Sequence, residues 1–308
     1  MHRFPRSLAG VGGMLLAVCL LAAPASAQTA GEGLSPTLAN IKRTHVVRLG
    51  YRESSPPFSF LDQSNRPIGY SLELCEAIVE EIGVEVDDAN LKIEYVKVTS
   101  DDRIAAVVQN KIDLECGSTT ANAERARLVA FSPLIFVAGT KLMVPKASTI
   151  SAPADLKGKT VVVTKGTTNE QAMHNVDKKF SLGLNIVTAS DHEQSYQTLV
   201  DGKADAFATD DILLYGLIAR HKSQGKFKVV GEYLSYDPYG IMFRKGEPQF
   251  TAVVERAFRK LGSNRDLIPL YNKWFVGRLP TGEKLGVSIS PQLEEAFKAM
   301  DDSPGGSN

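Results

Sequence analysis

A short polar segment that follows an apolar run is the first candidate for chemistry in this sequence. Gly117 precedes three hydroxyl residues, Ser118, Thr119 and Thr120, and Arg125 follows Thr120 by five positions. Hydroxyls and backbone N–H groups at a strand end, beside an arginine fork, form the kind of site that binds a carboxylate. Taken alone, these residues are more typical of a Ser/Thr-rich turn with a surface arginine. The choice between a site and a turn therefore depends on the rest of the chain.

A second candidate lies at the end of the first predicted strand, 46–51. Arg52 follows that strand directly, and Pro56 and Pro57 predict an irregular loop behind it. Ligands bind at the carboxyl ends of strands in open α/β sheets, so Arg52 is a ligand candidate. A solvated arginine is the alternative.

Two further candidates lie where a helix is expected to begin. Ser100 is a predicted N-cap, and Arg103 is expected in the first turn of the helix that follows. Capping alone would explain Ser100. A cation in the first turn is disfavoured by the helix dipole unless an anion lies nearby, which makes Arg103 the more informative of the two.

The second half of the sequence adds polar residues at comparable places. Gly166 begins a turn into a predicted helix that contains Thr168, and His192 begins another helix. A predicted strand ends at Asp210. His192 has no second histidine at the spacing of a zinc helix. The sequence therefore predicts no metal and no cofactor.

A weak internal repeat relates the two halves. Residues 107–115 and 199–207 each contain a helix end, a turn, Lys-X-Asp and a strand, at a constant offset of 92. The pattern predicts two lobes of similar topology whose strand and helix ends face each other across a cleft. At this offset two pairs of candidate residues correspond: Ser118 with Asp210, and Ser100 with His192.

The amino-terminal residues are typical of a secretory signal peptide. Arg3 and Arg6 precede an apolar stretch, and Ala25-Ser26-Ala27 predicts cleavage before Gln28. A lipid-modified Cys19 is a weaker alternative. Removing two arginines from 35 basic residues leaves 33 against 35 acidic residues, a net charge of −2. The signal peptide, with no later apolar run of membrane-spanning length, predicts an exported, soluble chain. The near-neutral charge gives no indication of binding to nucleic acid or anionic membranes. A mobile leader is expected up to about residue 39.

Two cysteines remain after this cleavage, Cys75 and Cys116. Cys75 is expected on the inward face of a helix over 71–82, beside the strand that carries Cys116. An oxidising compartment favours one disulfide between them, and two buried free thiols are the alternative.

Taken together, these motifs resemble the solute-binding proteins of polar amino-acid ABC importers, in particular the periplasmic glutamate/aspartate-binding proteins (solute-binding protein family 3). The resemblance is carried by segments 52–55, 99–103, 115–120, 166–168 and 209–211 in their order and spacing. It implies the type II periplasmic-binding-protein fold, with two α/β lobes joined by two crossover strands around a ligand cleft. The expected boundaries are 1–27 for the signal peptide, 28–139 and 236–308 for lobe 1, and 140–235 for lobe 2.

The resemblance also implies a ligand set for an acidic amino acid. Asp101 and Asp102, next to Arg103, depart from the pattern and leave the preference between glutamate and aspartate open. A ligand with two carboxylates and one ammonium needs more cationic donors than acids around it. The implied contacts are Thr120, Arg125 and Thr168 for the α-carboxylate, Ser118 and Asp210 for the ammonium, and Arg52, Ser100, Arg103 and His192 for the side-chain carboxylate.

The implied function is binding without chemistry, by a periplasmic monomer that delivers its ligand to an ABC permease in the inner membrane. An enzyme resembling the cyclohexadienyl dehydratases is the runner-up, with Glu53 or His192 as the general acid or base. A sensor subunit that presents the ligand to a membrane receptor is a third possibility.

Overall fold

The computed structural model describes residues 33–301. The chain divides into two units, Met1–Gly33 and Leu34–Asn308, and all the described residues except Gly33 belong to the second. The predicted signal peptide, with Cys19, lies outside the described residues, as do residues 302–308. No helix of the described part is both long and apolar enough to cross a membrane.

One five-stranded sheet defines the part of the molecule that we call lobe 1. The β-branched strand predicted over 46–51 is its second strand and lies parallel to both neighbours, with Leu49 opposite Leu114 and Gly50 opposite Glu115. The last two strands of the sheet run antiparallel to each other. The strand order is β5 (Lys92–Lys97), β1 (Val46–Tyr51), β6 (Leu114–Glu115), β15 (Met242–Arg244) and β7 (Val129–Phe131).

A second five-stranded sheet defines lobe 2. Its second strand has the sequence Thr-Val-Val-Val-Thr, and side chains alternate between its two faces. Val161 and Val163 pack in one apolar cluster and Val162 packs in another, so both faces of the sheet are buried. The order is β11 (Asn185–Ala189), β10 (Thr160–Thr164), β12 (Ala206–Asp210), β9 (Thr140–Pro145) and β13 (Phe227–Val230).

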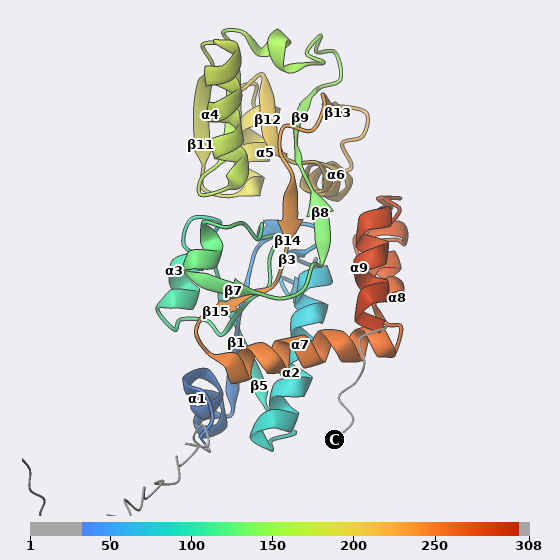
Figure 1. The fold of residues 1–308 in the computed structure, drawn as a ribbon. Helices are drawn as coiled ribbons and strands as arrows, with labels where there is room; N and C mark the ends of the chain where they lie inside the picture. The colour runs from blue at the N-terminus through green and yellow to red at the C-terminus, as the bar shows by residue number, and fades with distance from the viewer. Residues whose placement is uncertain (1–32, 302–308) are drawn as a thin grey trace, which may run out of the picture. The chain divides into compact units, whose positions relative to one another are not determined.

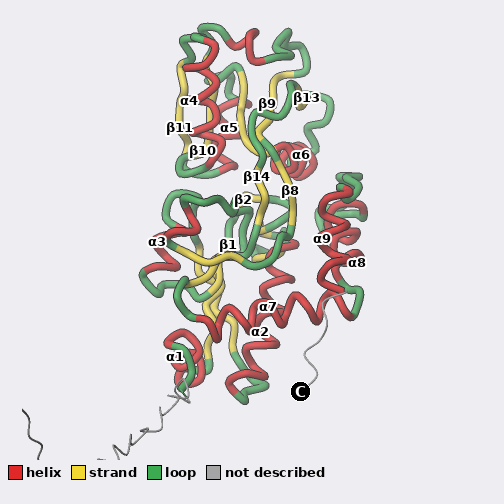
Figure 2. The backbone as a smooth tube through the Cα atoms, viewed as in Figure 1, coloured by secondary structure: helices red, strands yellow, loops and turns green. Residues whose placement is uncertain are grey.

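Two short strands connect the sheets. β8 (Phe136–Ala138) and β14 (Asp237–Tyr239) pair antiparallel, with Asp237 opposite Ala138. Figure 1 shows them side by side between the two sheets, and Figure 2 shows the chain passing from one sheet to the other at this place. β8 lies just before the expected lobe boundary at 139/140, and β14 lies just after the one at 235/236.

The helices cover the sheets, and their buried faces follow the apolar spacing of the sequence. Leu72, Cys75, Ile78 and Ile82 are buried on one face of α2, as their spacing predicts. The aromatic residues 271, 274 and 275 lie in the core, also as expected. The helices are α1 (Pro36–Thr44), α2 (Tyr70–Val86), α3 (Arg103–Val108), η1 (Arg125–Arg127), η2 (Pro153–Leu156), α4 (Thr168–Phe180), α5 (His192–Val200), α6 (Asp211–Arg220), α7 (Pro248–Ser263), α8 (Leu267–Tyr271), η3 (Asn272–Val276) and α9 (Pro291–Asp301).

Three local predictions were wrong. The described end of the expected mobile leader, up to about residue 39, is the start of helix α1, where Leu38 is buried and Thr37 donates two hydrogen bonds to Glu247. Ser100 does not cap the helix that follows. Helix α3 begins at Arg103, and the turn before it is closed by reciprocal hydrogen bonds between Thr99 and Asp102.

The loop after Arg52 is also more regular than its prolines predicted. It contains a small antiparallel sheet of three strands, β2 (Ser54–Ser55), β3 (Ser59–Leu61) and β4 (Pro67–Ile68). Pro56 and Pro57, joined by a cis peptide bond, lie in the turn between β2 and β3, where no ladder hydrogen bond is needed from them.

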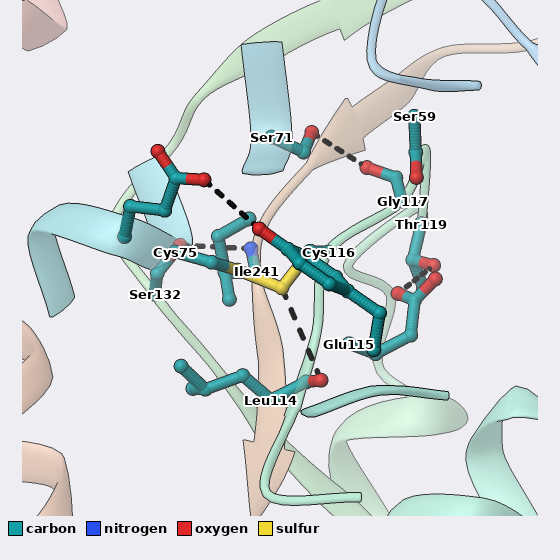
Figure 3. Close-up of a disulfide and its surroundings, with 12 residues drawn as sticks. Ser59, Ser71, Cys75, Leu114, Glu115, Cys116, Gly117, Thr119, Ser132 and Ile241 are labelled. Carbon is teal, nitrogen blue, oxygen red and sulfur yellow. Dashed lines mark hydrogen bonds between the residues drawn. A yellow bond between two sulfur atoms is a disulfide. The ribbon is translucent and has the colours of Figure 1, made fainter. Parts of the chain in front are cut away.

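The predicted disulfide is present. Cys75 and Cys116 are bonded and fully buried, which joins helix α2 to the segment after β6 (Figure 3). Ser71 Oγ donates a 2.8 Å hydrogen bond to the carbonyl oxygen of Gly117 in the same region. Together the two links hold the start of the polar segment 117–120 against α2.

We expect the Cys75→Ala, Cys116→Ala double variant to unfold at a clearly lower urea concentration than the wild type. The bond closes a loop with a sequence separation of 41, and such crosslinks stabilise by about 2–4 kcal/mol, chiefly by restricting the unfolded chain. The control is a reducing agent, which should destabilise the wild type and leave the variant unchanged. Equal unfolding midpoints would contradict a stabilising role.

Candidate functional site

A small cavity between the lobes brings most of the predicted site residues together. It is lined from lobe 1 by Ser100, Arg103, Ser118 and Thr120, and from lobe 2 by Thr167, Thr168, Asn169, His192, Asp210 and Leu213. A wider groove adjoins it and shares part of this lining. Of the other predicted residues, Arg125 lines the groove, whereas Arg52 is buried and lines neither space.

The fold explains why these side chains converge. Arg52 and Asp210 lie at the carboxyl ends of β1 and β12, where α/β sheets bind ligands. Thr168 and His192 are the first residues of α4 and α5. Helix amino termini carry partial positive charge and free N–H groups, so both helices direct favourable potential at an anion in the cleft.

Two arginines of lobe 1 are buried, and no acid forms an ion pair with either of them among the described residues. Arg52 and Arg103 are 1% and 2% exposed. Both terminal nitrogens of Arg52 and the Nε of Arg103 lack a hydrogen-bond partner. Burial, and then the charge of Arg103, lower the pKa of Arg52 to about 10, so it stays charged at neutral pH.

Arg125 contacts both lobes. Its Nη1 donates a 2.9 Å hydrogen bond to the carbonyl oxygen of Thr120 in lobe 1. Its Nη2 donates a 3.4 Å hydrogen bond to the carbonyl oxygen of Gly166 in lobe 2. Burial and the charge of Arg103 lower the pKa of Arg125 to about 10. Gly166 has φ +74°, and a side chain there would lie 2.7 Å from the Cα of Asp101 across the cleft. Only glycine fits this close approach.

His192 is a neutral polar group of the cavity. It is 1% exposed, and its Nδ1 lies 3.0 Å from Ser55 Oγ. Burial, followed by the charges of Arg52 and Arg103, holds its pKa well below the usual value of 6.5. Its Nε2 has no partner and remains available for a hydrogen bond.

Asp210 is the acid of the cavity, and neighbours that were not predicted orient it. Asn169 Nδ2 donates 2.7 Å to Asp210 Oδ1, and the hydroxyl of Tyr239 donates to Oδ2. Burial, and then the charge of Asp237, raise the pKa of Asp210 to about 7. A cation beside this carboxylate would favour its ionised form.

The sequence reasoning missed two further buried acids near the site. Glu115 is fully buried on β6, and its Oε2 accepts a 2.5 Å hydrogen bond from Thr119. Its negative charge raises the pKa of Arg52 and of Arg125, against the lowering caused by burial, so it offsets part of the positive charge of these two arginines. Asp237, on β14, accepts hydrogen bonds from Thr120 and Thr168. The signal for Glu115 was its place directly before the polar segment. No local pattern marks Asp237.

Several buried polar atoms at the site lack partners. Buried polar groups in native proteins are nearly always hydrogen-bonded, so such a concentration is typical of a ligand site. The atoms are Nη1 and Nη2 of Arg52, Nε of Arg103, Oγ of Ser100 and Ser118, Nε2 of His192 and Oε1 of Glu115. Among the described residues, no cluster of His, Cys, Asp or Glu has the arrangement of a metal site.

Two α/β sheets, two crossover strands and a polar cavity between the lobes define a type II periplasmic-binding protein. The sequence profile of the bacterial extracellular solute-binding proteins, family 3, matches residues 47–277. The chain belongs to this family.

Two characterised relatives are similar over nearly their whole length. The L-glutamate/L-aspartate-binding protein of Pseudomonas aeruginosa is 40% identical over 293 residues, which cover 94% of this chain and 95% of the relative. The glutamate/aspartate import solute-binding protein of Escherichia coli K12 is 35% identical over 289 residues, 94% of this chain and 96% of the relative.

Solved structures agree on the fold. The P235GK mutant of the arginine-binding protein from T. maritima has 26% identity and a TM-score of 0.69, covering 77% of this chain and 98% of that one. An ancestral amino acid-binding protein, described as a precursor of cyclohexadienyl dehydratase, has 29% identity and a TM-score of 0.66, covering 77% and 99%.

Proposed function

We propose that the protein captures L-glutamate or L-aspartate between its lobes and delivers it to an ABC importer. The observation that carries this is the pair of buried arginines, Arg52 and Arg103, which have no ion pair to an acid within the described residues. Buried charges need a partner, and a ligand carboxylate would supply it. The two relatives from P. aeruginosa and E. coli carry names of glutamate/aspartate-binding proteins, which supports the same ligand class.

The three charged groups of the ligand would meet different parts of the cavity. Arg125 offers a charged fork between the lobes to the α-carboxylate, beside Thr120 and Thr168. The ammonium would lie against Asp210 and Ser118. The side-chain carboxylate would lie among Arg52, Ser100, Arg103 and His192, three of which line the cavity.

The cellular setting is part of the same proposal. The chain would be exported by its signal peptide over 1–27 and act in the periplasm as a monomer with an inner-membrane permease as partner. Lobe 1 would comprise 28–139 and 236–308, and lobe 2 would comprise 140–235. The sheet strands of each lobe fall within these boundaries, which supports them.

Binding without chemistry is favoured over an enzyme on the same fold. Glu53, one of two candidate general acids or bases, pairs with Lys97 over 2.6 Å and does not line the cavity. The other, His192, is a weak proton acceptor, because burial and the charges of Arg52 and Arg103 hold its pKa well below the usual value. Recovery of unchanged glutamate after prolonged incubation with the protein tests this choice, and conversion of the ligand would overturn it.

We expect affinity for glutamate to rise with pH up to about 7 and then to level off. Burial raises the pKa of Asp210 to about 7, so below that pH the carboxyl is protonated in the free protein. An ammonium needs the ionised form, so binding must release that proton, and affinity should fall about tenfold per pH unit below pH 7. Calorimetry between pH 5.5 and 8 checks this, because the side chain of free glutamate stays ionised throughout that range.

Asp210→Asn is the control for this pH dependence. The variant should bind weakly at every pH, with little slope, because its side chain does not titrate. Equal wild-type affinity at pH 5.5 and pH 7.5 would contradict the assignment of Asp210 to the ammonium.

A further inference from the structure

A buried carboxylate lies where both lobes meet a crossover strand. Asp237 is the first residue of β14, is 2% exposed, and pairs across the strands with Ala138 of β8. It lines the groove beside the cavity. The ligand set proposed above does not include it, so its buried charge needs a separate explanation.

One oxygen of this carboxylate accepts hydrogen bonds from opposite sides of the cleft. Thr120 Oγ1 of lobe 1 donates to Asp237 Oδ1 over 3.1 Å, and Thr168 Oγ1 of lobe 2 donates to the same atom over 2.8 Å. The other oxygen accepts from the hydroxyl of Ser235. An ionised carboxylate only accepts hydrogen bonds, so each threonine hydroxyl is the donor in its bond to Asp237. The two hydroxyls also lie 3.3 Å from each other, across the cleft.

We propose that Asp237 is a positioning residue that clasps the two lobes together in the closed cleft through Thr120 and Thr168. Hydrogen bonds to an ionised group are stronger than those between neutral groups. The bond from Thr120 is buried and the bond from Thr168 is part-buried. When the lobes separate, Thr168 moves away from Thr120, and a single carboxylate oxygen cannot follow both. Opening therefore breaks at least one of the two bonds.

The clasp differs from an exposed polar contact between the lobes at the same rim, and it acts beside the contact of Arg125 with Gly166. Lys165 and Asp101 form a 2.9 Å ion pair across the cleft, but their side chains are 60% and 49% exposed. Exposed ion pairs contribute little because water and salt screen them. Of the clasp and this ion pair, the clasp is expected to hold the closed arrangement.

A different role for the same geometry has the opposite consequence. If Asp237 competed with the ligand α-carboxylate for the hydroxyls of Thr120 and Thr168, its removal would tighten binding. If it clasps the lobes, its removal weakens binding. The sign of the change therefore separates the two roles.

The experiment compares Asp237→Ala with wild type, using the amino acid that the wild type binds most tightly. The test therefore rests on the proposed function in one respect only, namely that the lobes close on some amino acid. We expect Kd to rise at least about tenfold, chiefly through faster dissociation, because the lost bonds belong to the closed state. The affinity for every amino acid that binds should fall by the same factor, so the ratio of glutamate to glutamine affinity stays unchanged. Asp237→Asn should lie between the two, because its amide oxygen still accepts.

Two matched variants and a double variant control the result. Ser235→Ala removes the partner of Oδ2 and the contacts of that hydroxyl with Thr140, but leaves both threonine bonds to Oδ1 in place. Asp101→Asn removes the exposed ion pair. Both variants should stay within about twofold of wild type. Combining Asp237→Ala with Thr168→Val should weaken binding by less than the product of the single effects. Thermal unfolding of each variant verifies that it is folded.

Small-angle scattering without ligand tests the clasp independently of any binding. We expect a larger radius of gyration for Asp237→Ala than for the wild type. The proposal would be overturned by unchanged or tighter binding of Asp237→Ala, or by multiplicative effects in the double variant. If the wild type binds no amino acid, equal radii of gyration would overturn it. Absence of glutamate and aspartate binding by the wild type would instead count against the proposed function.

Discussion

Replacing Arg125 with alanine is expected to reduce the affinity for every amino acid by about 150-fold or more. Arg125 is the buried fork that contacts both lobes, and the α-carboxylate is common to all amino acids. Removing one partner of a buried, hydrogen-bonded charge pair costs about 3–5 kcal/mol, most of it the desolvation of the charge left behind. Calorimetry with glutamate, aspartate and glutamine measures the loss for each ligand.

Arg127→Ala is the matched control, because Arg127 lies on the same short helix with its side chain exposed. This variant should bind like the wild type. If a folded Arg125→Ala protein binds within a few fold of the wild type, Arg125 does not hold the α-carboxylate.

Replacing Arg103 with methionine is expected to lower the ratio of glutamate to glutamine affinity at least about tenfold. Arg103 lines the cavity and has a free Nε, so a ligand carboxylate would neutralise a cation that no ion pair compensates within the described residues. Glutamine would leave this cation underpaired in the wild type, a cost that the variant no longer has. The ratio should therefore fall, mainly because the acids lose the attraction of Arg103, and to a smaller degree because glutamine no longer has this cost.

The Asp210→Asn variant is the internal comparison for this measurement. It should weaken glutamate and glutamine to a similar degree, because both ligands carry the same ammonium. An unchanged ratio in Arg103→Met would show that the side-chain carboxylate of the ligand does not bind at Arg103.

Much of the site was predictable because its residues occupy positions that the fold makes special. Arg52 and Asp210 follow strands, and Thr168 and His192 begin helices, so strand and helix ends alone brought them together. Ser100 lines the cavity, but the local reason for which it was singled out, capping of the next helix, was wrong. Its hydroxyl is free because Thr99 and Asp102 close the turn in its place.

The residues that were missed depend on contacts between distant parts of the chain. Asp237 contacts Thr120 across a separation of 117 residues, and nothing in its local sequence distinguishes it from an ordinary strand residue. The strands β2 and β3 have two and three residues, too short for a periodic pattern. Helix α1 was predictable, because Ser35 and Pro36 form a typical helix start before Leu38 and Ile41.

The most direct test of the proposed function is a calorimetric titration of the wild type with all the common amino acids. The buried arginine pair predicts that glutamate and aspartate bind at least about 100-fold more tightly than glutamine and asparagine, a difference of roughly 3 kcal/mol. Arginine and lysine should not bind, because each would bring a second cation to Arg52 and Arg103. Comparable affinities for glutamate and glutamine would contradict the assignment of an acidic ligand.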